Sequence, residues 1–171
     1  DMATEAFDAG ASILTHAFNA MRGLKHREPG PVGAALADER VVIEVIADGV
    51  HLHPDVIRVL FASVPSRVAL VTDAMAAAGS ADGEYSLGGL DVEVREGVAR
   101  LAEGGAIAGS TLTQDAALRV AVAAGAPLAV AVRALTSTPA AAVGRPDLGT
   151  LAVGALADAV LRVTVRWCWQ R

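Results

Sequence analysis

Three segments of the chain share one pattern, a short apolar run with a polar residue at its C-terminal edge. They cover residues 11–18, 41–51 and 67–74. Near-continuous runs of Val, Ile and Leu of this length are typical of strands buried on both faces, as in a parallel sheet. The pattern therefore predicts three parallel strands.

Segments with apolar residues at helical spacing separate these predicted strands. Residues 53–65 have this spacing after the second strand, and Pro54 suits a first helical turn. Residues 30–38 predict a short helix before the second strand, and residues 3–11 the end of a helix before the first. The order strand, loop, helix, strand predicts βαβ units.

A further helix is predicted over residues 110–125. Thr111 and Gln114 have the spacing of a capping box, in which two side chains satisfy the first backbone N–H groups of a helix. Gly125 follows as a signal for the helix end.

The rest of the C-terminal half mixes helical and strand patterns. Residues 127–135 and 139–144 predict two more helices. Glycine pairs and alternating valines in residues 82–108 predict β-hairpins, inserted in a loop. Residues 148–171 predict short strands and the start of a small β-sandwich segment.

The fold class predicted from these elements is α/β, a partial TIM-like (β/α) barrel. Such a barrel carries its active site at the C-terminal ends of its strands, and the predicted ends carry His16, Asp48, His51 and Asp73. A complete barrel needs about 250 residues. With three convincing strands, residues 1–147 are expected to form the C-terminal half of a barrel.

Composition limits the class of partner. The chain has 171 residues, enough for one domain with a core built mainly from Ala, Val and Leu, because 53% of residues are hydrophobic but only 4% aromatic. The balance of 14 Lys and Arg against 19 Asp and Glu gives a net charge of −5. This charge offers no electrostatic footprint for nucleic acid or an anionic membrane, so a small molecule is the expected partner.

The sequence contains no recognisable targeting signal, which favours the cytoplasm as the expected compartment. The run between Arg119 and Arg133 is shorter than the about 20 apolar residues that span a bilayer, so no membrane segment is expected. The acidic N-terminus does not resemble a secretory signal, and Cys168, a single cysteine, cannot form an intrachain disulfide.

Two readings of the strand-end residues stay open. A histidine such as His16 at the end of a buried strand is usually structural, but a parallel arrangement brings it to one rim with His51 and Asp73. Imidazole and carboxylate suit zinc and other divalent ions, although catalytic zinc usually has three protein ligands. Asp73 fits either a helix N-cap or a carboxylate that transfers protons during hydrolysis.

Two further segments suggest anion binding. The cationic loop of residues 22–27 follows His16 and Asn19, and it is either a solvated basic loop or a phosphate site in which Arg27 supplies a bidentate guanidinium. The segment AIAGSTL, residues 106–112, is expected to offer exposed backbone N–H groups at the start of a helix. Three of its residues are candidate substrate contacts: Ala108, Gly109 and Ser110.

Four motifs in fixed order carry a family resemblance. THAFNAM followed by REPG, then IADGVH, VTDAMAAAG and AGSTL resemble the N-acetylglucosamine-6-phosphate deacetylase family of the amidohydrolase superfamily, from the first residues to about Val160. The resemblance implies hydrolysis of the acetamide of the sugar phosphate, giving glucosamine-6-phosphate and acetate. It also implies a divalent metal cofactor, with zinc expected and Fe, Co or Mn as alternatives, and a homodimer.

The resemblance assigns roles to individual residues. It implies that His16 is a metal ligand, and that Asn19 and Ala20 hold the sugar phosphate. Arg27 matches a phosphate-binding arginine acting across a dimer interface, and His51 matches a substrate-binding histidine. Asp73, in VTDAM, matches the catalytic aspartate, which acts first as general base on the metal-bound water and then as general acid toward the departing amine.

Departures from the family pattern lead to an expectation about activity. The glutamate and second histidine that the family uses as metal ligands have no match here, nor does the first half of the barrel. The ending VLRVTVRWCWQR also departs from the family, as a truncation or a shifted reading frame. The chain alone is therefore expected to have weak metal affinity and little deacetylase activity.

Two alternative functions follow from the same residues. The first is a metal-dependent amidohydrolase acting on another acylamino sugar or a cyclic amide, against which Arg27 and Asn19 argue. The second is a non-catalytic fragment that binds sugar phosphate.

Overall fold

The computed structural model describes residues 2–156 and 158–160. Its central element is a parallel sheet of three strands in the order β1-β2-β3, formed by β1 (Ile13–Leu14), β2 (Val42–Ile46) and β3 (Val68–Val71). Neighbouring strands in the sheet are also consecutive in the chain. This order confirms the predicted parallel strands and is the order in which the strands of a (β/α) barrel are wound.

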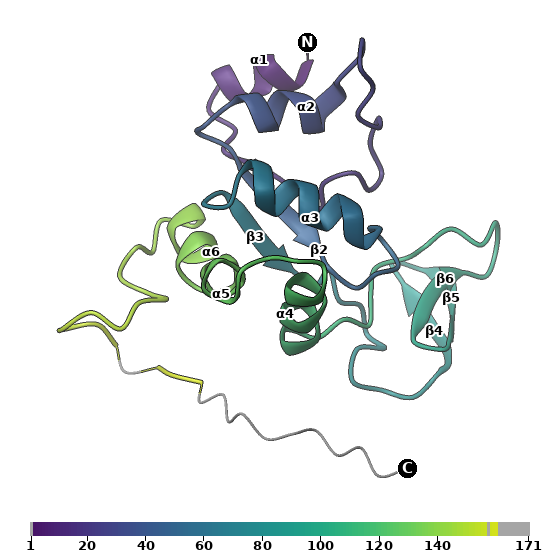
Figure 1. The fold of residues 1–171 in the computed structure, drawn as a ribbon. Helices are drawn as coiled ribbons and strands as arrows, with labels where there is room; N and C mark the ends of the chain where they lie inside the picture. The colour runs from purple at the N-terminus through teal and green to yellow at the C-terminus, as the bar shows by residue number, and fades with distance from the viewer. Residues whose placement is uncertain (1, 157, 161–171) are drawn as a thin grey trace.

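Helices connect these strands as the sequence predicts. Helix α1 (Met2–Asp8) precedes β1, α2 (Gly30–Ala37) connects β1 to β2, and α3 (Pro54–Ser63) connects β2 to β3. Pro54 occupies the first turn of α3, where its missing N–H costs no hydrogen bond, and the ring of His53 accepts from the backbone N–H of Asp55. In Figure 1, α1 and α2 lie together at one end, and α3 crosses in front of β2 and β3.

One face of the parallel sheet forms the main core. Ile43 and Val45 of β2 pair in register with Val68 and Leu70 of β3, and all four side chains are at most 1% exposed. Paired residues of adjacent parallel strands point to the same side of a sheet, so these side chains form one continuous apolar surface. Helix α2 packs against β1 and β2, while the helices after residue 113 pack against β3.

Arg67, at the start of β3, ties helix α2 to the sheet. Its guanidinium donates to four backbone carbonyls: Nη1 lies 2.9 Å from the carbonyl oxygen of Ala35, 2.8 Å from that of Asp38 and 2.6 Å from that of Val41, and Nη2 lies 2.9 Å from that of Leu36. The last carbonyls of a helix have no partner within the helix, so a cation at this position satisfies them.

A second sheet follows β3. It consists of β4 (Gly83–Leu87), β5 (Leu90–Arg95) and β6 (Val98–Leu101), paired antiparallel in chain order. The hairpins predicted within residues 82–108 are thus present. This sheet has a small core of its own and stands apart from β2 and β3 in Figure 1.

Three helices complete the described part. They are α4 (Gln114–Ala123), α5 (Leu128–Leu135) and α6 (Ser137–Ala142), and α5 and α6 lie next to each other. The predicted capping box is wrong, because α4 begins at Gln114 itself. The Thr111 hydroxyl donates to the carbonyl of Gly97, and the Gln114 side chain donates to the carbonyl of Leu70, 3.3 Å away. Long-range partners therefore replace the local ones.

Two other predictions have partial outcomes. The first strand is shorter than predicted, because residues 15–20 form turns that follow β1. Residues 148–156 and 158–160 contain no strand, and the rest of the predicted β-sandwich segment lies outside the described residues, so that segment stays a prediction.

The α/β class is confirmed, whereas closure into a barrel is not shown by this chain. Across the described residues, the structure contains no helix with the length and apolarity to cross a membrane.

Candidate active site

The predicted site residues follow the C-terminal ends of the three parallel strands. His16 comes two residues after β1, Asp48 two residues after β2, and Asp73 two residues after β3. Because parallel strands end at one edge of a sheet, this order brings the three positions to that edge.

The backbone at this edge is held in an unusual conformation. Four non-glycine residues there have positive φ angles, and they are His16 (31°), Phe18 (73°), Ala20 (54°) and Asp73 (51°). Each such residue costs on the order of 1–3 kcal/mol, and strained residues of this kind cluster at functional sites. Within the described chain, Glu96 is the one further example, in the turn between β5 and β6.

His16 has a buried nitrogen with no partner. The neighbouring N–H of Ala17 donates to the carbonyl oxygen of Glu44 on β2, 2.8 Å away, which fixes the turn. Nδ1 of His16 is buried and has no hydrogen bond among the described residues. An unsatisfied buried nitrogen costs about 1–3 kcal/mol, and a divalent cation accepts the lone pair of a neutral imidazole.

As a metal ligand, His16 fits in kind but does not complete a site. The described residues contain no group of three or more His, Cys, Asp or Glu side chains placed to hold a metal ion. Catalytic zinc usually has three protein ligands. A complete set of donors thus requires ligands beyond those that the described residues supply.

Asn19 shapes the loop after β1. Its Nδ2 donates to the carbonyl oxygens of His16 and Ala17, at 3.3 and 3.1 Å. Both amide donors are therefore engaged, and the side chain offers an anion no free N–H in this conformation. Ala20 is exposed, and its backbone N–H has no hydrogen-bond partner within the described chain, so the main chain at Ala20 offers a free hydrogen-bond donor.

Asp48 and His51 form the closest side-chain pair of the site. Oδ2 of Asp48 lies 2.6 Å from Nδ1 of His51, and Oδ1 accepts from the backbone N–H groups of Val50 and His51, both at 2.8 Å. Burial alone raises the pKa of the Asp48 carboxyl, but the hydrogen bonds from the His51 side chain and from the two backbone N–H groups outweigh it and leave the pKa below its usual value. The carboxylate is therefore ionised near neutral pH.

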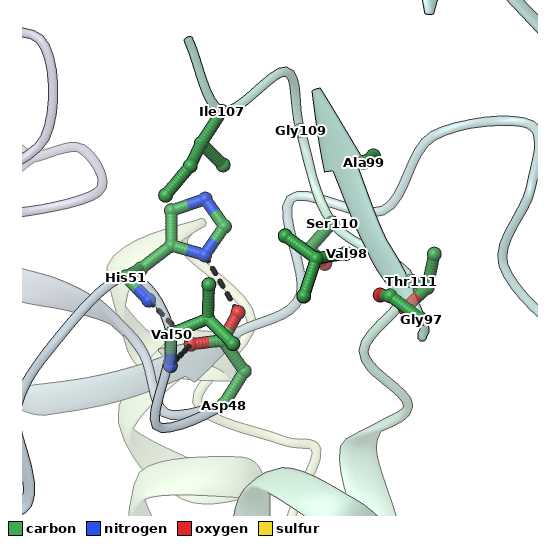
Figure 2. Close-up of a pocket in the computed structure, with 10 residues that line it drawn as sticks. All are labelled: Asp48, Val50, His51, Gly97, Val98, Ala99, Ile107, Gly109, Ser110 and Thr111. Atoms are coloured by element: carbon green, nitrogen blue, oxygen red, sulfur yellow. Dashed lines mark hydrogen bonds and ion pairs between the residues drawn. The ribbon is translucent and has the colours of Figure 1, made fainter. Parts of the chain in front are cut away.

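A small pocket opens beside this pair. One wall is formed by Asp48, Val50 and His51, and Figure 2 shows the His51 ring turned toward the opposite wall, which two segments from far along the chain supply. Those segments contribute Gly97, Val98 and Ala99 on one side and Ile107, Gly109, Ser110 and Thr111 on the other.

The segment around Ser110 joins the Asp73 loop to the second sheet. The N–H of Ala108 donates to the carbonyl of Ala99 at 3.1 Å, and the N–H of Ser110 to the carbonyl of Asp73 at 2.8 Å. The Ser110 hydroxyl donates to the carbonyl of Thr72. The expectation of exposed N–H groups at a helix start is therefore wrong for Ala108 and Ser110, and α4 begins only at Gln114.

Gly109 allows this close approach. Its φ is +64°, and a Cβ atom there would lie 3.2 Å from the carbonyl oxygen of Asp73 and 3.2 Å from Cβ of Met75. Both the backbone conformation and the space favour glycine. The N–H of Gly109 has no hydrogen-bond partner in the described part, so of the three candidate contacts it is the one with a free backbone donor.

Asp73 is exposed at the edge of the sheet. No helix begins there, because the next helix after β3 is α4, so the N-cap interpretation is wrong. What remains is a carboxylate open to solvent and to a ligand.

The basic loop lies on the surface. Arg27 is exposed, with Nη1 2.8 Å from Nε2 of His26, and Lys25 forms an exposed ion pair of 3.7 Å with Glu28. Within the described residues, no hydrogen bond or ion pair joins Arg27 to the strand-end residues. This loop would therefore bind an anion from the solvent side, without direct contact between Arg27 and the strand-end residues of the same chain.

Sequence reasoning missed the wall that faces His51. The pattern over residues 82–108 predicts hairpins, but nothing local indicates that Val98 and its neighbours lie beside a histidine almost fifty residues earlier. The alternating positive φ angles after β1 were also missed, because none of the residues there is glycine.

Comparisons with known proteins give a consistent set of relatives. The model of the Amidohydrolase family matches residues 1–164. An N-acetylgalactosamine-6-phosphate deacetylase of Escherichia coli O157:H7 is 54% identical over 114 residues, which are 67% of this chain and 30% of the relative. An N-acetylglucosamine-6-phosphate deacetylase of Bacillus subtilis is 45% identical over 117 residues, which are 68% of this chain and 29% of the relative. The matched part of the chain thus covers less than a third of the length of each of these two relatives.

A solved structure has a similar fold over most of this chain. It is an Asp-to-Ala mutant of N-acetyl-D-glucosamine-6-phosphate deacetylase from Mycobacterium smegmatis in complex with N-acetyl-D-glucosamine-6-phosphate. It matches with a TM-score of 0.88 and 49% sequence identity, over 92% of this chain and 43% of that one.

Proposed function

Because the chain belongs to the amidohydrolase family, we propose that its site serves to hydrolyse the acetamide of N-acetylglucosamine-6-phosphate, giving glucosamine-6-phosphate and acetate. The observation that carries the proposal is the buried, unpartnered Nδ1 of His16 at the strand edge that also carries Asp73. The names of the relatives and the sugar phosphate bound in the M. smegmatis structure support the choice of substrate.

His16 is the residue of this chain that would hold a divalent cation, and zinc suits an imidazole ligand. When bound, such an ion lowers the pKa of a coordinated water and polarises the amide carbonyl. The chain's own contribution is to keep an imidazole nitrogen buried and free of competing hydrogen bonds.

Asp73 is the proton-transfer group. A carboxylate at this edge accepts a proton from the attacking water and returns it to the amine nitrogen as the C–N bond breaks. The role requires a carboxylate that substrate can reach, and Asp73 is exposed.

The sugar phosphate is held by groups around this edge. The backbone N–H of Ala20 and that of Gly109 have no partner within the described residues, and His51 and Gly109 both line the pocket that residues of β6 also line. Asn19 stabilises the turn that presents Ala20. Arg27 supplies a guanidinium to the phosphate from the exposed loop, which suits a contact across a homodimer interface.

Completion of the sheet belongs to the same proposal. Strands β1 and β3 each pair on one side only within the described residues, and native proteins usually cover or otherwise protect such exposed strand edges. A closed (β/α) barrel would pair both edges. Further strands of such a barrel could also place metal ligands near His16, at the C-terminal ends of the strands.

N-acetylgalactosamine-6-phosphate is a second candidate substrate. The observation in its favour is the E. coli O157:H7 relative at 54% identity, which carries that substrate in its name. The two sugars differ only in the orientation of one hydroxyl, so the same site chemistry serves both.

Calorimetric titration of the purified chain tests the proposal. Each sugar phosphate and unphosphorylated N-acetylglucosamine is added with and without zinc, and acetate release is followed in parallel. We expect tighter binding of the phosphorylated sugars, and the tighter of the two identifies the preferred epimer. Equal affinity for the phosphorylated and unphosphorylated sugars, or no binding of any of them, would contradict the proposal.

A further inference from the structure

The Asp48 carboxylate has a donor on each of its oxygens. Oδ1 accepts two backbone N–H groups, from Val50 and His51, and Oδ2 lies 2.6 Å from Nδ1 of the His51 ring. Three hydrogen bonds from one four-residue turn fix the plane of the carboxylate. The side chains of His51 and Asp48 are only 6% and 13% exposed, so water competes little for these bonds.

This geometry determines which ring nitrogen of His51 carries a proton. An ionised carboxylate can only accept hydrogen bonds, so Nδ1 must be the N–H donor. In a neutral imidazole the other nitrogen, Nε2, then keeps its lone pair, and in a charged imidazolium it becomes a second donor. In both states Nε2 is the nitrogen left for a ligand.

Nε2 is also the nitrogen that faces the pocket. Figure 2 shows the ring directed away from Asp48, with its second nitrogen toward the side of the pocket that Ile107 lines. Rotating the ring by half a turn would place carbon atoms against Oδ2 and lose the 2.6 Å contact. The pair therefore fixes both the orientation of the ring and its proton.

We propose that Asp48 is a positioning residue that keeps a proton on Nδ1 of His51 and so presents Nε2 to an oxygen of the bound sugar phosphate. Asp48 acts through His51, because both of its carboxylate oxygens are already engaged by the turn and the ring. The identity of the ligand rests on the proposed function, whereas the proton position does not. A sugar hydroxyl would donate to the neutral ring, and a phosphate oxygen would accept from the charged one.

The variant Asp48→Asn separates this role from a purely structural one. The amide oxygen of Asn replaces Oδ1 and still accepts the two backbone N–H groups, so the turn is kept. The amide nitrogen replaces Oδ2 and is a donor, which requires Nδ1 to be an acceptor and moves the ring proton to Nε2. The matched control is Asp55→Asn, because Asp55 lies 3.5 Å from Nδ1 of the exposed His53.

The readout is the ¹⁵N spectrum of the 171-residue chain labelled at its four histidines. At a pH of about 8.5, where an ordinary imidazole is neutral, we expect the Nδ1–H form of His51 in the wild type and in Asp55→Asn. We expect the Nε2–H form in Asp48→Asn. An Nε2–H form in the wild type overturns the proposal even if Asp48→Asn does not fold, and so does an unchanged ring in a folded Asp48→Asn.

Ligand titrations in the same spectra test the contact. N-acetylglucosamine-6-phosphate is expected to shift the His51 ring signals, and Asp48→Asn to weaken its binding roughly two- to tenfold, as for one lost hydrogen bond. N-acetylglucosamine alone and inorganic phosphate identify which oxygen is contacted. Binding detected by calorimetry while the His51 ring signals stay unchanged overturns the contact. Absence of all binding contradicts the proposed function and leaves the measured proton position as a separate result.

Discussion

At the residue scale, His16 carries the most specific chemistry. Its Nδ1 is buried without a partner among the residues that the structure describes, so the metal-free chain is destabilised there and a cation would supply a partner. The variant His16→Leu is therefore expected to be at least as stable as the wild type without metal and to lose the rise in melting temperature on adding zinc. Thermal unfolding with and without zinc measures both effects.

The exposed His26 provides the control for this comparison. His26→Leu should keep the zinc-dependent rise in melting temperature, because this ring lies on the surface beside Arg27. An equal loss of the rise in both variants would show that zinc binds by another route.

Asp73 is expected to control the rate of acetate release. Asp73→Asn keeps the size of the side chain but removes the group that accepts and returns the proton, and general acid–base groups contribute roughly 10²–10⁴-fold. Any acetate release by the zinc-supplemented chain should fall by that order. Asp91→Asn, at an exposed aspartate of β5, should leave the rate unchanged. Equal rates in all three proteins would remove Asp73 from the mechanism.

The Asp48 carboxylate should also make stability depend on pH. Its folded pKa is lowered, so its contribution is fully present above the unfolded pKa of about 4 and is lost as the pH falls through the folded value. The difference in free energy of unfolding between wild type and Asp48→Asn is expected to shrink below a pH of about 4. Urea unfolding at a series of pH values measures this difference. A difference that grows on acidification would contradict the prediction.

Single residues were predictable from the sequence where a strand end placed them. His16, His51 and Asp73 each follow an apolar run, and the structure places all of them after parallel strands. The donors of Asn19 and Ser110 were not predictable in the same way. Their partners are set by turns with positive φ angles and by contacts across 37 residues, which no local pattern encodes.

At the scale of elements, Arg67 shows how one side chain holds a helix to a sheet. Arg67→Met keeps much of the apolar stem but removes four donated hydrogen bonds, two to carbonyls of α2 and two to carbonyls of the segment between α2 and β2. Because hydrogen bonds to a charged group contribute about 1.5–3 kcal/mol each and are not additive, we expect a loss of about 2–4 kcal/mol in the free energy of unfolding. Urea unfolding provides the measurement.

Arg58→Met is the matched control for Arg67→Met. Arg58 is exposed and pairs with Asp55 at 2.8 Å on the surface of α3. Such pairs contribute about 0–1 kcal/mol. A loss as large as that of Arg67→Met would show that the carbonyl contacts of Arg67 are not the cause.

The helices were predicted well from the spacing of apolar residues, and their starts less well. The spacing gives α3 and α5 almost to the residue, because each presents one apolar face to the core. The start of α4 differs because Thr111 bonds to Gly97 and Gln114 to Leu70, so tertiary partners override the local capping pattern.

At the scale of the whole molecule, the sequence predicts the parallel α/β sheet because its strands are continuous apolar runs. The position of the second sheet was not predictable, since it depends on pairings such as that of Ala74 with Ser110 that join distant segments. The long-range part of the site therefore required the structure.

The open sheet and the incomplete set of metal donors predict little activity for the isolated chain. The described residues supply one well-placed imidazole and no group of three donors. We expect zinc-supplemented, purified chain to release acetate far more slowly than a complete enzyme of this family under the same assay. Comparable rates would show that the described residues are sufficient.

The segment of residues 108–110 connects the β4–β6 sheet to Asp73, the proposed proton-transfer residue. The main chain of Ala108 is bound to β6, and that of Ser110 to the carbonyl of Asp73. A shift of the hairpins would thus be transmitted to the backbone of Asp73 through three residues. If Asp73 has the proposed role, changes in the length or surface of the hairpins would alter the rate of acetate release without altering any residue of the proposed site.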